Sequence, residues 1–400
     1  VAVKEEDCIK DMEKEGLDLE IQDGYLSAKQ TSLGGDDGIA VAYALAILDD
    51  DSLSHPRLEF VCTVCEEVGM EGATGIDVSM LKGKKLLNMD SEEEGVMLAS
   101  CAGGCRADVK LPVERETVSG TKLTVSLSGL TGGHSGSEID KGRGNANILM
   151  SRLLRDASAP VAIASIEGGR KDNAIPRECT AQIIVAPDEA AAVKASIEQA
   201  AAEIAEEFKA SDPDLKLTVS EETDCSESAI SAKDSARVIA LIEALPNGII
   251  RMSREIDKLV ETSLNLGVLK SDAAAVTLRY AVRSSVGVAK KSLKNQLVCI
   301  AGAFDAEVTF EGDYPAWEYK KDSKLREDMV RIFEEMYGKK PTVEAIHAGV
   351  ECGLLSGKIE GLDCISMGPD MYDIHTTEER LSISSAKRSY EYILRVIACK

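Results

Sequence analysis

The 400-residue sequence has few aromatic residues, few histidines and no long apolar run. Phe, Trp and Tyr together make up 4% of it, so a core has to be built mainly from Val, Leu, Ile and Ala, which suits parallel sheets covered by Ala-rich helices. No apolar run reaches the roughly 18 to 20 residues of a membrane-spanning helix. The start of the chain does not have the charged-then-apolar pattern of a secretory signal. We therefore predict a soluble α/β protein.

Positive charge is also scarce. There are 46 basic against 69 acidic residues, which gives a formal net charge of −23. Such a chain repels phosphate backbones and anionic lipids, so no nucleic acid and no membrane surface is expected as a partner. Small molecules and metal cations remain. The length and the 44% hydrophobic content predict more than one domain.

The eleven cysteines lie partly inside apolar segments such as 58–65 and 298–301. In a chain of this length we interpret them as small buried hydrophobic residues in a reducing cytoplasm and not as a disulfide framework. Cys62 and Cys65 have CxxC spacing. Residues three apart on a strand point to opposite faces, so packing is favoured over zinc ligation for this pair.

Three acidic clusters lie at the ends of predicted elements in the first hundred residues, one before a helix and two after strands. The stretch LGGDDGIAVAYALAILDDD (33–51) predicts a loop that leads into a helix. The stretches 57–67 and 84–95 predict strands that end in acidic residues. Ligands bind at the carboxyl edge of open parallel sheets, so we expect the three clusters to converge there.

The rest of the chain predicts an inserted domain. From about residue 105, strands and amphipathic helices alternate, and their order recurs after residue 233, which predicts a duplicated α+β unit. The last 85 or so residues resume the character of the first hundred. We therefore predict a sheet domain formed by residues 1–104 and 315–400, interrupted by an inserted domain at 105–314.

Each acidic cluster also has an ordinary explanation. Asp36 and Asp37 can cap the helix that follows them, Glu66 and Glu67 can end a solvated strand, and Asp90 can open a soluble loop. If they converge, however, like-charge repulsion is costly unless cations or protons neutralise it. Oxygen and imidazole ligands favour Zn, Co or Mn at a hydrolytic site, where two ions typically lie about 3.5 to 4 Å apart. One of two adjacent glutamates can then bind metal while the other takes a proton from water.

The four histidines differ in their surroundings. His55 lies in a polar loop and is the weakest candidate for a functional role. His134 has glycines on both sides that expose it, which favours a functional role over an ordinary loop position. His347 opens the HAGVECG stretch and can equally be a structural hydrogen-bonding residue. His375 lies late in the resumed sheet domain, with acidic residues nearby that can orient its second nitrogen.

Nine strings carry a resemblance to a known family. They run in order along nearly the whole chain: LGGDDGIA (33–40), EEVGMEGA (66–73), NMDSEEEG (88–95), GGHSGSE (132–138), NANILM (145–150), DNAIPRE (172–178), PNGIIR (246–251), HAGVECG (347–353) and IHTTEE (374–379). With these strings the chain resembles peptidase D, the aminoacyl-histidine (Xaa-His) or cytosol non-specific dipeptidases, a group of zinc exopeptidases that includes carnosinases. The resemblance implies an α/β zinc-exopeptidase catalytic domain with a mostly parallel sheet. It also implies an inserted lid and dimerisation domain. The exposed edges expected for the sheets of this lid predict a homodimer.

The resemblance also implies roles for residues of the catalytic domain. Asp36 corresponds to the carboxylate that bridges two divalent metal ions, zinc first and Co or Mn as alternatives, and its peptide bond to Asp37 is expected to be cis. Glu66 corresponds to the general base. Glu67 and His375 correspond to ligands of the first ion, and Asp90 to a ligand of the second.

Further roles concern the substrate. His134 corresponds to a lid histidine that stabilises the developing oxyanion, and Asn173 and Arg283 to lid residues that hold the substrate. A bidentate arginine suits the free carboxylate of a dipeptide. Gly349 corresponds to a backbone contact with the same end of the substrate.

One expected motif is absent from the sequence. In the family a histidine of an H-x-D motif also binds the second ion, and that motif is expected just before Val1, after an earlier strand. We therefore expect the sequence to be part of a longer protein. For these 400 residues alone we expect weakened binding of the second ion and little activity.

The leading hypothesis is hydrolysis of unblocked dipeptides, of Xaa-His type, by a water that bridges two metal ions, with Glu66 as the base. The alternatives are an N-acyl amino acid deacylase, a tripeptide aminopeptidase, and a catalytically impaired homologue or binding protein. The strings at 172–178 and 347–353 favour the dipeptidase. The presence of Glu66 beside a ligand glutamate argues against a protein without activity.

Overall fold

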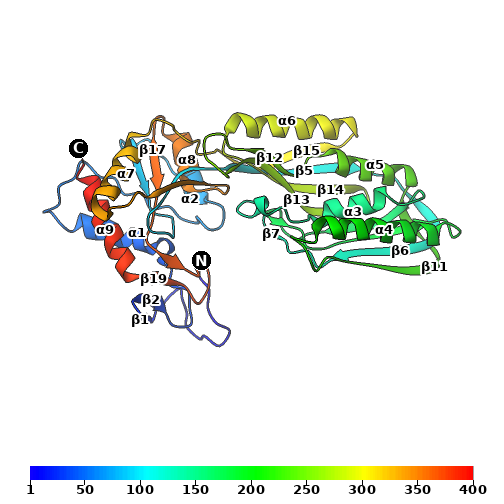
Figure 1. Ribbon diagram of the computed structural model, residues 1–400, viewed down its shortest axis with the longest axis horizontal. Helices are drawn as coiled ribbons and strands as arrows, with labels where there is room; N and C mark the ends of the chain where they lie inside the picture. The colour runs from blue at the N-terminus through cyan, green and yellow to red at the C-terminus, as the bar shows by residue number, and fades with distance from the viewer. Residues whose placement is uncertain (400) are drawn as a thin grey trace. The chain divides into compact units, whose positions relative to one another are not determined.

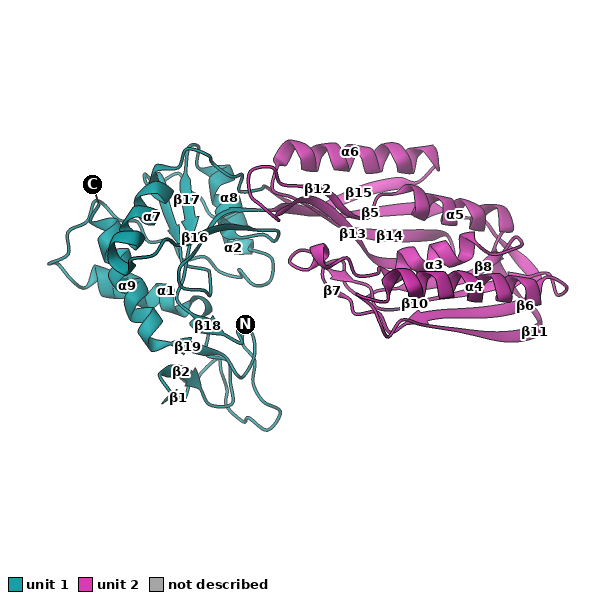
Figure 2. Ribbon diagram, viewed as in Figure 1, with its two compact units in different colours: residues 1–101, 316–400 teal, residues 102–315 magenta. Residues whose placement is uncertain are grey.

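The computed structural model describes residues 1–399, and the chain divides into two compact units (Figure 2). Unit 1 comprises residues 1–101 and those from 316 on, and unit 2 comprises residues 102–315. The first boundary therefore lies three residues earlier than the sequence predicts, because the strand that begins at Gly103 belongs to the sheet of unit 2. No helix within residues 1–399 is both long enough and apolar enough to cross a bilayer.

Unit 1 contains a mixed sheet, a small antiparallel sheet and five helices. Its elements are β1 (Leu19–Gln22), β2 (Tyr25–Ala28), α1 (Gly35–Leu48), α2 (Glu71–Gly75), β3 (Lys85–Asn88), β4 (Val96–Cys101), α7 (Lys324–Tyr337), β16 (Thr342–Ile346), α8 (Glu351–Lys358), β17 (Asp363–Ser366), β18 (Met371–Tyr372), β19 (Arg380–Ser382) and α9 (Ile383–Ile397). The mixed sheet has the order β16-β4-β17-β3. The pairs β16–β4 and β17–β3 are parallel, whereas β17 and β4 are antiparallel.

Helices cover both faces of this sheet. On one face, α1, α7 and α9 enclose a core that includes Met97 and Ala99 of β4. The intervening Leu98 packs on the other face, in a cluster that contains Cys352 of α8 and Trp317. This alternation along β4 is the two-residue period of a strand buried on both sides. The second sheet, β1-β2-β19-β18, lies beside the loop that carries His375.

The prediction of a strand over residues 57–67 is wrong. No strand occurs in this stretch, and Phe60, Val64 and Val68 are exposed. The stretch contacts the chain just before β3 through a side chain, because the carboxylate of Glu59 accepts the backbone N–H groups of residues 82 and 83, each at 2.8 Å. Strand propensity reflects packing against a paired neighbour, and this stretch has no backbone ladder with β3 among the described residues.

The cysteines are less buried than predicted. All eleven are free thiols within residues 1–399, but Cys62, Cys65 and Cys299 are exposed. The packing role predicted for the Cys62–Cys65 pair is therefore wrong, because the strand that was to bury it does not form. Cys299 lies on the outward face of a helix. The buried cysteines are Cys8, Cys101, Cys105, Cys179, Cys225, Cys352 and Cys364.

Unit 2 is built around a nine-stranded sheet. Its elements are β5 (Gly103–Pro112), β6 (Arg115–Ser128), β7 (Gly133–His134), a 3₁₀ helix (Ile139–Lys141), α3 (Ala146–Arg155), β8 (Ala162–Gly168), β9 (Ala174–Ile175), β10 (Cys179–Val185), α4 (Ala190–Phe208), β11 (Lys216–Ile230), α5 (Ala232–Ala244), β12 (Gly248–Met252), β13 (Val260–Ser271), β14 (Ala275–Ser284), α6 (Gly287–Ala303) and β15 (Glu307–Tyr314). Figure 1 shows the helices α3, α4, α5 and α6 along this sheet. They pack on it through one continuous apolar core.

The strand order of this sheet reflects the predicted duplication. It reads β11-β6-β10-β8-β13-β14-β5-β15, with β12 paired to β13. The outer half β11-β6-β10-β8 repeats, in reverse, as β13-β14-β5-β15, and each half carries two helices. The halves meet where β8 pairs with β13. The duplicated α+β unit is therefore visible in the topology, with β5 supplied by the chain before the first copy begins.

Candidate active site

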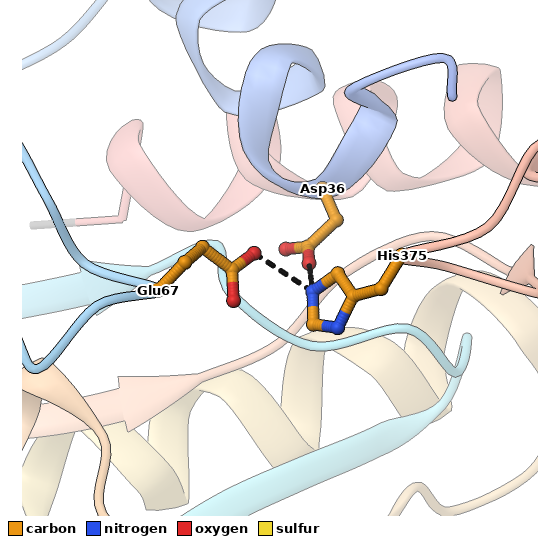
Figure 3. A group of neighbouring side chains, drawn as sticks. All are labelled: Asp36, Glu67 and His375. Carbon is orange, nitrogen blue, oxygen red and sulfur yellow. Dashed lines mark hydrogen bonds and ion pairs between the residues drawn. The ribbon is translucent and has the colours of Figure 1, made fainter. Parts of the chain in front are cut away.

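Three of the predicted metal ligands come together in unit 1. Nε2 of His375 lies 2.7 Å from Oε1 of Glu67 and 3.1 Å from Oδ2 of Asp36. One ligand atom from each residue lies within 4.8 Å of the others, and Figure 3 shows the three side chains pointing toward one another. They come from the start of α1, the loop before α2 and the loop between β18 and β19. This is the arrangement that a cation with oxygen and imidazole ligands requires.

Asp36 and Asp37 lie at the irregular start of α1. The peptide bond between them is cis, as the resemblance implies, and neither residue has helical backbone angles. The carboxylate of Asp37 accepts a hydrogen bond from the backbone of Ala40. Asp37 therefore caps the regular part of the helix, whereas Asp36 contacts His375. The capping and cluster roles foreseen for the pair fall on different residues.

Glu66 and Glu67 lie in a tight turn. The backbone N–H groups of Gly69 and Met70 donate to the carbonyl oxygen of Glu66 at 3.1 and 2.8 Å. Gly72 then passes so close to the backbone of residue 64 that an added Cβ would lie 2.4 Å from its N and O atoms. The turn is thus held by local backbone contacts and not by a strand, contrary to the prediction.

His375 lies in a loop that closes on itself. Its φ of 63° is in the left-handed region, which histidine tolerates better than most residues and which is enriched at functional sites. Arg380 forms an ion pair with Asp373 across the loop. The prediction that nearby acids orient the second nitrogen of His375 is wrong for Glu379. The carboxylate of Glu379 instead accepts backbone N–H groups at the start of α1.

Asp90 follows β3 and contacts Asp36. Its carboxyl group hydrogen-bonds the carboxylate of Asp36, but it is not a member of the three-residue ligand group. Ser366 of β17 donates to its backbone oxygen at 3.3 Å. Asp36 therefore contacts both His375 and Asp90.

The crowding of carboxyl groups raises their pKa values. Burial, followed by the charges of Glu66 and Asp36, raises the pKa of Asp90 to about 8. Burial, followed by the charge of Asp36, raises the pKa of Asp37 to about 7. Burial and repulsion therefore favour the protonated form of Asp90, whose carboxyl group contacts Asp36. A retained proton is expected where carboxyl groups are too close for all of them to ionise.

Glu66 titrates closer to neutrality than an ordinary glutamate. Burial, followed by the charge of Glu67, raises its pKa to about 6. Burial and Glu67 also raise the pKa of Asp36, although His375 opposes the shift. The pKa of Glu92, which the sequence did not single out, is raised by burial and by Asp36. A divalent cation would relieve the same repulsion, so the donor set and its charge both fit a metal ion.

Three further residues of unit 1 were considered from the sequence. His347 and Gly349 lie just before α8, and His55 lies in another loop. Gly349 comes two residues before α8, where unpaired N–H groups begin. His347 is buried, which agrees with the structural alternative. His55 lies in an exposed loop, where its Nδ1 is 2.7 Å from the carbonyl oxygen of Pro56.

In unit 2 the structure brings His134 and Asn173 together. The short strands β7 and β9 pair so that His134 is opposite Ala174, the neighbour of Asn173. The N–H of Ser135 also donates to the carbonyl oxygen of Asn173 at 2.9 Å. The backbone N–H of His134 donates to Glu138 at 2.8 Å. Hydrogen bonds of the backbone N–H groups of His134 and Ser135 therefore fix the loop around the histidine.

The ring of His134 is oriented by its own loop. Its Nδ1 accepts the backbone N–H groups of Gly136 and Ser137 at 3.2 and 3.1 Å. A nitrogen that accepts cannot carry a proton, so the neutral ring is protonated at Nε2. Burial, followed by the charge of Arg283, lowers the pKa of His134, while Glu138 opposes the shift.

Arg283 lies on β14, near His134 in unit 2. Its Nε is buried and has no hydrogen-bond partner within residues 1–399. A buried guanidinium N–H without a partner is costly, and a planar carboxylate is the group it binds best. The three predicted residues of unit 2 thus form one neighbourhood with an imidazole donor and a cation.

Comparison with known proteins identifies the family. A segment at residues 125–212 matches the model of the peptidase dimerisation domain of M20 proteins. Over 389 residues the sequence is 34% identical to the cytosol non-specific dipeptidase of Escherichia coli. The matched segment covers 96% of this chain and 80% of that relative. The chain belongs to the cytosol non-specific dipeptidase family. The resemblance carried by the nine sequence strings is confirmed.

Solved structures agree with the predicted fold. The aminoacylhistidine dipeptidase of Vibrio alginolyticus superposes with a TM-score of 0.91 at 32% identity, over 98% of this chain and 81% of that one. The aminopeptidase PepT of Bacillus cereus has a TM-score of 0.50 at 16% identity, over 96% of this chain and 76% of that one, and so shares the fold. The predicted catalytic α/β fold with an inserted lid domain is confirmed.

Proposed function

We propose that this chain is a metal-dependent dipeptidase that hydrolyses unblocked dipeptides, with those of Xaa-His type as first candidates. The observation that carries the proposal is the contact of His375 Nε2 with Glu67 and Asp36, at 2.7 and 3.1 Å. Membership in a family of dipeptidases supports the same reaction. The N-acyl deacylase and tripeptidase alternatives receive no such support.

The metal component of the proposal is two divalent ions, zinc first and Co or Mn as alternatives. Asp36, Glu67 and His375 would hold one ion, and Asp36 with Asp90 would contribute to the second. When bound, such ions supply Lewis acidity, which polarises a carbonyl group and lowers the pKa of water. Deprotonation of Asp90 is then favoured, because a cation takes the place of its proton.

Glu66 is assigned the role of general base. Its pKa of about 6 leaves it ionised near neutral pH yet basic enough to accept a proton. It takes one proton from the attacking water, whose oxygen forms a bond to the peptide carbon. It then passes that proton to the departing amino group as the C–N bond breaks. Charge and atoms balance, and Glu66 returns to its ionised state.

The unit 2 residues are assigned to the substrate. His134 acts as a neutral N–H donor through Nε2 toward the developing oxyanion, because its Nδ1 is occupied by two backbone donors. Arg283 binds the free carboxylate of the dipeptide, and Asn173 assists it. Gly349, in the segment before α8 of unit 1, is assigned a backbone contact with the substrate. An unblocked dipeptide satisfies these groups at its charged carboxyl end.

Assembly and location complete the proposal. The match to a peptidase dimerisation domain supports a homodimer, in which His134 acts in its own subunit or in the partner. The cytosolic name of the Escherichia coli relative supports a cytoplasmic protein. Light scattering in solution tests the dimer. Mixed dimers of His134→Ala and Glu66→Gln subunits test the subunit assignment, because activity returns only if the histidine acts across the interface.

The central test measures release of amino acids from β-Ala-His and Gly-His with added Zn²⁺ or Co²⁺. We expect metal-dependent turnover by the full-length protein that chelation abolishes and that Glu66→Gln removes. The exposed acid Glu71 lies in the next element, so Glu71→Gln is a control for the loss of one charge. Turnover of N-acyl amino acids alone would instead assign the site to a deacylase.

A further inference from the structure

A buried carboxylate outside the candidate ligand group contacts the backbone beside Asp36. Glu379 ends the loop that carries His375, and 2% of it is exposed. Its Oε2 accepts the backbone N–H of Gly34, and its Oε1 accepts that of Gly35, each at 2.8 Å. Oε1 also lies 3.3 Å from the backbone N of Asp36. Three consecutive N–H groups thus converge on one side chain.

The local sequence permits this approach. Gly34 has a φ of +66°, a backbone conformation that favours glycine, and it turns the next N–H groups to the same side. A Cβ on Gly35 would meet Leu33 at 3.2 Å and Oε1 of Glu379 at 3.4 Å, which is close contact. Successive N–H groups in such a turn form a concave site for an anion. In this protein the anion is part of the chain itself.

The contact links two of the candidate ligands. His375 lies four residues before Glu379 in one loop, and Asp36 follows the two glycines that Glu379 binds. The loop is closed by the ion pair of Arg380 with Asp373. Any movement of the turn at Gly34 that displaces Asp36 therefore has to break hydrogen bonds to the loop that positions His375.

The charge of Glu379 calls for an explanation. It adds a buried carboxylate to a region that already holds the acidic side chains of Asp36 and Glu67. Its oxygens interact with backbone N–H groups at the start of α1, and no basic side chain forms an ion pair with it within residues 1–399. Orientation of Asp36 explains why a carboxylate is placed there, because an apolar residue would leave three N–H groups unpaired.

We propose that Glu379 is a positioning residue that sets the first metal ion's site by fixing the backbone of Asp36 relative to His375. The inference rests on the proposed function, because it assumes that Asp36, Glu67 and His375 bind a divalent cation. Residues that orient metal ligands typically contribute about 10- to 100-fold to metal affinity. Glu379 is not a member of the candidate ligand group Asp36, Glu67 and His375.

The test titrates the metal-free protein with Co²⁺ and follows the visible d–d absorption, which reports coordination geometry. Glu379→Gln keeps the shape but turns an amide NH₂ toward a backbone N–H. We expect its cobalt affinity to fall about 10- to 100-fold and its spectrum to change. The adjacent Glu378 is exposed, so Glu378→Gln removes the same charge and is expected to bind cobalt like the unmodified protein.

The outcomes separate the two proposals. Cobalt binding of unchanged affinity and spectrum in folded Glu379→Gln would overturn the positioning role and leave the proposed function intact. Failure of the unmodified protein to bind cobalt would overturn both. Circular dichroism of the metal-free proteins checks folding. If Glu379→Gln does not fold, Glu379→Asp decides, because it keeps the charge and is one methylene too short; wild-type binding by that variant contradicts the proposal.

Discussion

The two units position their chemistry in different ways. In unit 2, His134 and Arg283 lie on strands or next to them, above a core in which the strands β6, β10 and β14 bury side chains completely. In unit 1 the ligand groups lie on loops and at an irregular helix start, and they contact one another through their side chains. Ladder hydrogen bonds and close packing hold the first set, whereas the second set consists mostly of acidic side chains that repel one another. Unit 1 should therefore depend on a cation and unit 2 should not.

The largest effect expected in unit 1 is on the reaction. Glu66→Gln removes the proposed base with little change in shape, and kcat should fall about 10²- to 10⁴-fold. Steady-state hydrolysis of Gly-His at saturating zinc measures it. Glu71→Gln is the control. A Glu66→Gln enzyme with near-normal kcat would show that another group accepts the proton.

The largest effect expected on stability lies in unit 2. Leu123 is fully buried in β6, so Leu123→Ala should lower the free energy of unfolding of unit 2 by about 2 to 5 kcal/mol. Leu45 of α1 is 63% exposed, and Leu45→Ala should change stability by less than about 0.5 kcal/mol. Urea unfolding followed by hydrogen exchange in each unit compares the two. Equal costs would contradict the burial difference.

Metal binding should affect the units unequally. Zinc at about 100 times its dissociation constant should stabilise unit 1 against unfolding by about 2.7 kcal/mol. The loops at 33–40, 64–70 and 373–379 should gain protection in hydrogen-exchange mass spectrometry. Peptides from β6, β10 and β14 are the internal control. Protection spread evenly over both units would argue against a site confined to these loops.

The smallest effect concerns His134, whose folded pKa is lowered from 6.5 by burial and Arg283. The stability linked to this group is therefore present above pH 6.5 and is lost as the pH falls through its folded pKa. Nitrogen NMR of the imidazole should show a proton on Nε2 at neutral pH. Arg283→Gln should raise the pKa of His134.

Arg279, on the same strand, is paired with Asp108 at 2.8 and 2.7 Å. Arg279→Gln should therefore leave the pKa of His134 unchanged and is the control for removal of one positive charge. A proton on Nδ1 in the unmodified protein would contradict the tautomer assignment.

Much of the fold could be predicted from local pattern. The amphipathic helices predicted to alternate with strands from about residue 105 occur as α3 to α6. The predicted strands of unit 2 occur as well. These elements have a clear apolar period, and they bury it in the way that the period requires.

The prediction failed where local pattern and tertiary partner diverge. The stretch 57–67 has the composition of a strand, but no neighbouring backbone pairs with it. Cys62 and Cys65 are exposed for the same reason. Glu379 lies within the string IHTTEE, but the sequence predicted no role for it. Its hydrogen-bond partners are backbone groups some 340 residues earlier in the chain, so the residues next to Glu379 do not indicate them.

The sequence by itself determined the α/β class, the repeated unit and the family, since periodicity and ordered motifs are local properties of the chain. Its acidic clusters also indicated a cation site, because so many carboxylates need neutralisation. Only the tertiary structure decided which of them meet. It joined Asp36, Glu67 and His375, brought Asp90 into contact with Asp36, and gave Glu379 its contact with the glycine turn. Such choices depend on distances of a few ångströms between segments far apart in the chain, which no local pattern contains.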